Sequence, residues 1–247
     1  MKTCFFVFSL LSFSGLYAQT AKEIVQAADA KMRGNTSQAQ IIIQTVRPSW
    51  SREMTVATWM KGTERAMILV QSPAKDKGIT YLKRKKEVWN WIPALEKNIK
   101  LPPSMMSQSW MGTDFTNDDL VKESSIVNDY DHSITGDTVI AGRSCYKIRM
   151  LPKPEAAVVW GRLLVCIDKK DYLELYTLFY DEEGILVNTM TASDVKTMDG
   201  RLIPTRFEML PADKPGHKTI MIYKSIQYNR PIDDGFFTPE KMKSLND

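Results

Sequence analysis

The hydrophobic pattern of the chain begins, after residue 18, with the four-residue period of a helix. Ile24 and Ala28 are one turn apart and therefore lie on one face. Thr20 and Glu23 form a capping box, in which each side chain accepts a hydrogen bond from the backbone N–H of the other residue. Gly34 is a typical helix stop. The pattern predicts a short amphipathic helix that ends before residue 34.

From residue 38 onward the pattern changes to short runs rich in β-branched and aromatic residues, separated by turn residues. The predicted strands are residues 41–43, 54–60, 65–70, 79–82, 88–92, 98–101, 133–140, 143–151, 161–168, 173–180, 185–195, 201–209 and 218–228. About a dozen strands at hairpin spacing favour a barrel or sandwich over alternating strands and helices. No low-complexity linker divides the chain, so we expect one mainly β domain over residues 19–247.

One stretch, residues 102–112, fits neither period. Two prolines argue against a strand, but the stretch carries four large apolar side chains, namely Met105, Met106, Trp110 and Met111. Loops normally lie at the surface, so these side chains need a cover. Either the stretch plugs the mouth of a barrel or it shields a ligand cleft, and the two do not exclude each other. Residues 117–122, with acidic residues in the first turn, predict a short helix after it.

Residues 1–18 have the pattern of a cleavable secretory signal. Lys2 is positive, residues 5–16 form an apolar run, and the small residue Ala18 ends the segment. The run is too short for a membrane span, which takes about 20 apolar residues. Cys4 precedes the run, so a lipoprotein signal is not indicated. We expect export through the inner membrane and a mature protein free in solution in the periplasm.

Composition and charge exclude several function classes. A formal net charge of +4 is too mild to indicate nucleic acid as a partner. The two histidines, His132 and His217, are far apart, and no nucleophile elbow, phosphate-binding glycine loop or two-histidine zinc motif is present. Residues 129–132 have metal-binding side chains, but a solvated entry to the next strand explains them more simply. We therefore expect no enzyme activity, no cofactor and no metal.

The one run of basic residues is Lys83, Arg84, Lys85 and Lys86. A solvated hairpin tip explains it, because exposed turns are commonly charged. The functional interpretation is a docking patch for an acidic partner or for anionic lipid headgroups, where each basic residue contributes about 1 kcal/mol.

Two cysteines follow the leader, Cys145 and Cys166, and they fall in neighbouring predicted strands. If Tyr146 paired with Val165, the two cysteines would stand opposite each other on one face of the sheet. The expected compartment permits a disulfide. Two buried free thiols that pack as small hydrophobic side chains are an equally good interpretation.

Several tryptophans lie in or near predicted strands. Trp59, Trp89 and Trp91 are of this kind, and the last two have the same parity and so point to one face. Packing in the core accounts for most of them. The alternative is a dry pocket lined by aromatic residues and methionines, because methionine adapts to varied apolar ligands.

The segments 88–93, 100–106 and 109–120, together with the closing residues 237–239, resemble the LolA-like outer-membrane lipoprotein-sorting proteins. The resemblance extends over essentially the whole chain after the leader. It implies an incomplete, strongly curved antiparallel β-barrel with short helices across its concave side.

The resemblance also implies a function, a periplasmic carrier or chaperone that holds acyl chains of lipoproteins or other lipids in the concavity for transfer to the outer membrane. The alternative is an envelope module that senses lipid or docks on an inner-membrane transport complex through residues 83–86. The expected partners are a lipid ligand, an inner-membrane transporter and an outer-membrane acceptor, with the protein as a monomer. The candidate ligand-binding residues are Trp59, Trp89, Trp91, Met105, Met106, Trp110 and Met111.

Overall fold

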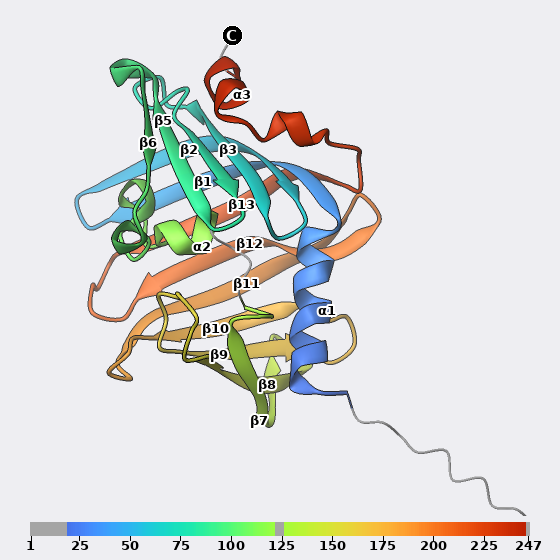
Figure 1. The fold of residues 1–247 in the computed structure, drawn as a ribbon. Helices are drawn as coiled ribbons and strands as arrows, with labels where there is room; N and C mark the ends of the chain where they lie inside the picture. Colours follow the sequence, from blue (N-terminus) through green and yellow to red (C-terminus); the bar gives the residue numbers. More distant parts are fainter. Residues whose placement is uncertain (1–18, 122–125, 246–247) are drawn as a thin grey trace, which may run out of the picture.

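Antiparallel strands make up most of the computed structural model, which describes residues 19–121 and 126–245 (Figure 1). The thirteen strands in the described residues are β1 (Thr36–Arg47), β2 (Trp50–Lys61), β3 (Arg65–Ser72), β4 (Thr80–Arg84), β5 (Glu87–Ile92), β6 (Lys97–Lys100), β7 (Tyr130–Ile140), β8 (Arg143–Pro152), β9 (Arg162–Asp168), β10 (Glu174–Tyr180), β11 (Leu186–Met198), β12 (Arg201–Pro211) and β13 (Lys218–Tyr228). The α-helices are α1 (Ala21–Arg33), α2 (Asn117–Val121) and α3 (Pro239–Ser244). Four 3₁₀ turns are η1 (Pro93–Leu95), η2 (Pro103–Met105), η3 (Trp110–Gly112) and η4 (Asp234–Phe236).

All thirteen strands belong to one curved sheet with the order β6-β5-β4-β3-β2-β1-β13-β12-β11-β10-β9-β8-β7. Every pair of adjacent strands in the sheet joins neighbours in the chain except the central pair, in which β1 pairs with β13. The sheet therefore consists of two meanders, β1–β6 and β7–β13, joined along this central pair. The barrel is not closed, because β6 and β7 are its two free edges. The mainly β, incomplete-barrel prediction is confirmed.

Helix α1 forms as its capping box predicts. The Glu23 backbone N–H donates to Thr20 Oγ1 at 3.2 Å, and the Thr20 N–H donates to Glu23 Oε2 at 2.8 Å. At the other end the Gly34 N–H donates to the Ala30 carbonyl, and its φ of 66° is one that glycine adopts without strain. Both ends of the predicted helix are confirmed.

Helix α1 and the segment 101–121 cover the same face of the sheet, called the inner face below (Figure 1). The apolar stripe of α1 packs on the β7–β12 half of that face, with Ile24 and Val25 in the core. Segment 101–121, the first part of the connection between β6 and β7, packs on the β1–β5 half, with Met106 and Trp110 in the core. The two covers therefore shield apolar side chains of the inner face from solvent.

The outer face carries separate, smaller clusters. The C-terminal segment with η4 and α3 lies over β4 and β5, where Phe237 and Met242 pack against Met67 and Leu82. Strand alternation sends these residues of β3 and β4 outward, while Ile68 and Tyr81 beside them point inward.

The thirteen predicted strands all form, with bounds shifted by a few residues. The predicted helix at 117–122 begins where expected, and residue 122 lies outside the described residues, as does the predicted leader at 1–18. None of the described helices combines the length and apolar character that crossing a bilayer requires.

Candidate functional site

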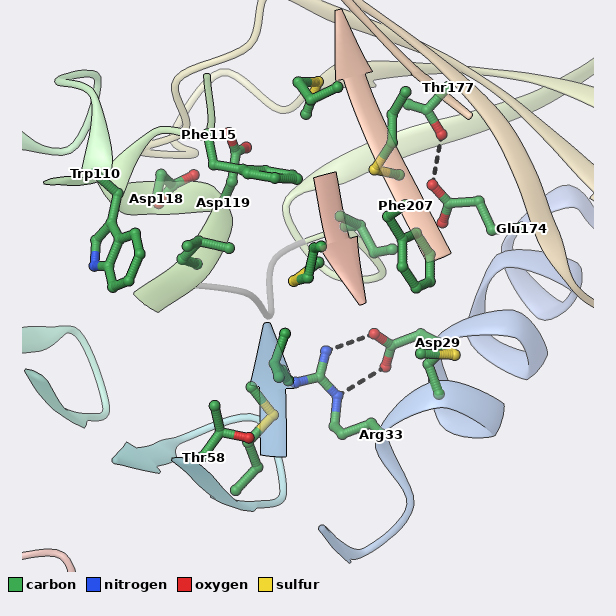
Figure 2. Close-up of a pocket in the computed structure, with 18 of the residues that line it drawn as sticks. Asp29, Arg33, Thr58, Trp110, Phe115, Asp118, Asp119, Glu174, Thr177 and Phe207 are labelled. Atoms are coloured by element: carbon green, nitrogen blue, oxygen red, sulfur yellow. Dashed lines mark hydrogen bonds and ion pairs between the residues drawn. The ribbon is translucent and has the colours of Figure 1, made fainter. Parts of the chain in front are cut away.

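A cavity of about 230 Å³ lies between the inner face of the sheet and its two covers. Strands of both meanders form its walls, and residues of α1 and of the segment 110–120 line it from the side of the covers. Figure 2 shows Trp110, Phe115 and the acidic residues of α2 on one side, and the last turn of α1 on another. Most of the lining side chains are apolar, so the cavity suits a hydrocarbon ligand.

Methionines are the most frequent residue type in this lining. Those that line the cavity are Met32, Met60, Met150, Met190, Met209 and Met221. Their flexible thioether side chains adapt to ligands of different shape. Sequence reasoning placed the methionines of interest in the loop at 102–112 and missed these six. Strand parity was the available signal for Met150, which shares a face with Ile148.

Hydrogen bonds between the last turn of α1, the first cover, and residues of the β7–β13 meander hold this helix in place. Lys31 Nζ donates to the Asp171 carbonyl at 2.6 Å. The Arg201 guanidinium donates to the carbonyls of Ala30, at 3.0 Å, and Lys31, at 3.2 Å. Positive side chains at a helix C-terminus also complement its dipole.

The second cover, segment 101–121, is tied to the central strands by two arginines. Arg47, at the end of β1, donates to Asp114 Oδ2 at 2.9 Å and to the Gly112 carbonyl at 2.9 Å. Arg52, in β2, donates to the Met111 carbonyl. These contacts fix the turn that presents Trp110 to the core.

Asp119 connects the second cover to the other meander. Its Oδ1 accepts from Trp160 Nε1 at 2.9 Å and its Oδ2 from the Thr116 N–H at 2.8 Å. Burial raises the pKa of this carboxyl, against the effect of those hydrogen bonds. Asp119 and Trp160 both line the cavity, so the contact closes one of its walls.

Charged residues of α1 and β10 line another part of the cavity. Arg33 donates to Asp29 through two nitrogens, at 2.5 Å and 3.2 Å, and the two side chains are only 7% and 14% exposed. Glu174 Oε1 accepts from Thr177 Oγ1 at 2.5 Å (Figure 2).

Of the four loop residues predicted to bind a ligand, one lines the cavity and three lie in or against the core cluster beside it, whereas the three predicted on strands lie on the other face of the sheet. Trp110 lines the cavity, and Met106 is buried in the same core cluster. Met105 and Met111 are half-buried against that cluster. The three remaining candidates, Trp59, Trp89 and Trp91, pack around the C-terminal segment on the outer face. Their strand parity turns them away from the cavity.

The basic run 83–86 is divided by the fold. Lys83 is 3% exposed, and its Nζ donates to the Thr63 carbonyl at 2.5 Å. The prediction of a four-residue docking patch is therefore corrected for Lys83, which lies within β4 rather than in the turn. Arg84, Lys85 and Lys86 are exposed.

The two cysteines are both free and buried. The predicted register is wrong by two residues, because Cys145 pairs with Asp168 and Cys166 with Lys147. The cysteines do share the outer face, where they pack with Leu173 and Leu175. Such diagonal positions are too far apart for a bond without backbone movement. The free-thiol interpretation holds in this structure.

In the described parts of the chain, no group of three or more His, Cys, Asp or Glu side chains could hold a metal ion.

A family model with the description "-like: Uncharacterized protein" matches residues 62–244. The chain belongs to this family. No curated protein matches it in sequence.

Solved structures with the same fold include the following three. A DUF1329 family protein from Desulfovibrio piger has a TM-score of 0.82 at 20% identity, over 90% of this chain and 97% of that one. A LolA superfamily protein from Nitrosomonas europaea has a TM-score of 0.80 at 22% identity, over 91% and 100%. A domain from Vibrio parahaemolyticus, described as an outer membrane lipoprotein-sorting protein, has a TM-score of 0.81 at 18% identity, over 90% and 98%. The chain therefore has the LolA-like fold, which confirms the fold that the resemblance implied.

Proposed function

We propose that this protein is a periplasmic carrier that binds acyl chains of lipoproteins or other lipids in the inner-face cavity for transfer to the outer membrane. The observation that carries the proposal is a mainly apolar, methionine-rich cavity that lies beneath two separate covers. Two of the structures that share the fold are described as LolA superfamily and lipoprotein-sorting proteins, which supports the same function.

The size of the cavity favours one hydrocarbon chain at a time. A volume of about 230 Å³ is just below the roughly 300–1,000 Å³ of pockets for drug-sized ligands. A twelve-carbon chain gains about 9 kcal/mol in gross terms, at about 0.8 kcal/mol per buried CH₂. Burial alone can therefore drive binding, and no catalytic group is needed. A ligand with several chains requires α1 or segment 101–121 to move outward.

The carrier proposal includes export, an inner-membrane donor and an outer-membrane acceptor. Removal of the leader between Ala18 and Gln19 is the step that intact-mass measurement checks on protein recovered from the periplasm. A retained leader, or a cysteine that carries an acyl group, would contradict it.

Two measurements test ligand binding. Native mass spectrometry of protein purified from its own periplasm is expected to show bound lipid. In titrations with a neutral probe, dodecyl maltoside below its critical micelle concentration, Ala39→Phe is expected to weaken binding at least about tenfold, because the ring fills the cavity that Ala39 lines.

The matched control for this test is Ala94→Phe, which places the same ring on the exposed turn η1. Thermal unfolding of both variants checks that the fold is kept, since overpacking costs about 1–3 kcal/mol. Equal affinity of the folded Ala39→Phe protein and the wild type would place ligand binding elsewhere.

A second candidate function rests on the exposed turn at Arg84, Lys85 and Lys86. In this second function the protein is an envelope module that docks through these residues on an acidic partner in the inner membrane and transports no lipid. An empty cavity in native mass spectra, together with a stable membrane-protein complex lost on neutralising the turn, would favour this second function over the carrier.

A further inference from the structure

Basic residues collect at one edge of the sheet, where strand β6 is a free edge and α3 lies over β4 and β5 (Figure 1). Residues 84–100 and α3 together hold seven basic residues against three acidic ones. Their surplus of four equals the formal net charge of +4 of the whole chain, so the rest of the chain is neutral on balance. Residues 84–100 with α3 are called the β6 edge surface below. Its basic residues are Arg84, Lys85, Lys86, Lys97, Lys100, Lys241 and Lys243.

Tryptophan rings lie beside two of these lysines. Lys100 Nζ is 5.8 Å from the centre of the Trp89 ring, and Lys243 Nζ is 5.3 Å from the centre of the Trp91 ring. Both tryptophans are half-buried on the outer face, so the parity that turns them from the cavity turns them toward these lysines. Tryptophan and lysine each join an apolar body to a polar or charged end, which suits the boundary between a bilayer and water.

Two large apolar side chains of the same surface are exposed to solvent. Leu95, in the turn η1 between β5 and β6, is 56% exposed, and Ile99 of β6 is 38% exposed. Single exposed apolar residues are common on protein surfaces and need no partner by themselves. Here they lie on a hairpin that also carries a surplus of positive charge. This combination fits a partner with an anionic layer above an apolar one.

Lysines on a free edge strand also have a structural explanation, because charge there discourages pairing with other chains. That explanation covers Lys97 and Lys100 of β6. It does not account for Lys243, which lies on a helix. Nor does the other free edge follow it, because the 11 residues of β7 include no lysine or arginine. Protection of the edge therefore does not explain the whole basic surface.

We propose that the β6 edge surface docks on a lipid bilayer with anionic headgroups. Its basic side chains contact the phosphate layer, and Leu95 enters the apolar layer beneath it. An acidic protein partner would also pair with the charges, but it would give no role to Leu95. Docking of this kind needs no ligand in the cavity, so it goes beyond the proposed carrier function.

Sedimentation with vesicles tests the docking. The purified protein is mixed with vesicles of phosphatidylcholine alone, or of phosphatidylcholine with the anionic lipid phosphatidylglycerol. We expect partition onto the anionic vesicles to be at least about tenfold stronger, and this preference to weaken as salt is added. Equal partition onto both kinds of vesicle would overturn the proposal. Absence of binding to either, the result expected for an acidic protein partner, would overturn it as well.

A triple variant assigns the contact to the β6 edge surface. Neutralising one exposed lysine in each of its three parts is expected to lower partition onto anionic vesicles by about tenfold or more, since each charge contributes about fivefold. The changes are Lys86→Gln, Lys97→Gln and Lys243→Gln.

The matched control removes the same charge from three exposed lysines elsewhere on the molecule, and its partition is expected to change little. Its changes are Lys170→Gln, Lys196→Gln and Lys224→Gln. Equal losses in the two triple variants would show that overall charge attracts the protein, and would overturn the assignment to this surface.

Leu95→Ser tests the apolar part of the contact. It is expected to weaken partition by about tenfold, because the leucine side chain no longer leaves water. Leu151→Ser is the control, since Leu151 is 42% exposed and lies on β8, near the opposite edge of the sheet. Equal partition of the two leucine variants would overturn the insertion of Leu95.

The cavity variant separates this docking from the carrier function. Ala39→Phe fills the cavity and is expected to bind anionic vesicles as the wild type does. Loss of vesicle binding in Ala39→Phe would place the contact with lipid at the cavity and overturn docking through the β6 edge surface. If the wild type bound dodecyl maltoside but no vesicles, the docking would be refuted and the acyl-chain site would stand.

Discussion

Replacing Trp110 by alanine tests whether its side chain is part of the folded core or becomes buried only when a ligand binds. Trp110 is 0% exposed, and its ring packs against Tyr81 with centroids 5.6 Å apart. It comes from a segment with no regular strand, yet it lies among the buried residues of β1–β5. The same ring is also a wall of the cavity.

The expected loss is large. Trp→Ala substitutions in a packed core cost about 3–5 kcal/mol, against a total stability of about 5–15 kcal/mol for a typical domain. For a chain of this size that corresponds to a fall in Tm of about 6–20 °C. Affinity for dodecyl maltoside should fall as well, because one wall of the cavity is lost.

Urea unfolding followed by circular dichroism measures the loss, and Trp50→Ala is the control. Trp50 is 49% exposed, with the Arg47 guanidinium 5.8 Å from its ring, so its removal should cost little. If Trp110→Ala lost no more stability than Trp50→Ala, segment 101–121 would not be part of the folded core, and its role as a fixed cover would be refuted.

Three further predictions follow from individual contacts. Thiol labelling under denaturing, non-reducing conditions should find both Cys145 and Cys166 reactive, and two blocked thiols would contradict the free pair. Burial lowers the pKa of His132, so the unfolded chain takes up a proton first as the pH falls below about 6.5. The free energy of unfolding should therefore decrease in that range, and His132→Gln should remove this part of the decrease; parallel pH profiles of the two proteins would exclude it. Asp114→Ala leaves Arg47 largely buried without its carboxylate and should lower stability by about 3–5 kcal/mol in the same urea assay, whereas a loss below about 1 kcal/mol would mean that water replaces the carboxylate.

Local signals in the sequence were sufficient for the secondary structure, but they left barrel and sandwich open, and the incomplete barrel was expected from the family resemblance. Turn residues bounded the strands. Thr20, Glu23 and Gly34 marked the two ends of α1, because a capping box and a glycine C-cap depend only on residues close together in the chain. The loop residues Met106 and Trp110 were recognisable as covered because large apolar side chains do not stay in water.

What sequence reasoning missed depends on contacts between distant segments. The cysteine register required knowing that Tyr146 pairs with Ile167, which strand alternation does not determine because a shift of two residues keeps every side chain on its face. The outward tryptophans on β2 and β5 find their partners in the C-terminal segment, far away in the chain. The buried state of Lys83 likewise depends on a backbone carbonyl of the preceding hairpin.

The pairing of β1 with β13 means that the central strand pair of the sheet forms last. All other strand pairs join neighbours in the chain, so each can form as soon as its hairpin has been made. The central pair, with Ile42 opposite Ile222, must wait until the last strand emerges. Until then β1 is an unpaired edge that carries three consecutive isoleucines, the kind of edge that recruits other chains. The incomplete chain is therefore prone to aggregation until β13 is available to pair with β1. Deletion of β13 alone would leave the meander β1–β6 and the strands β7–β12 without the strand pairing that joins them.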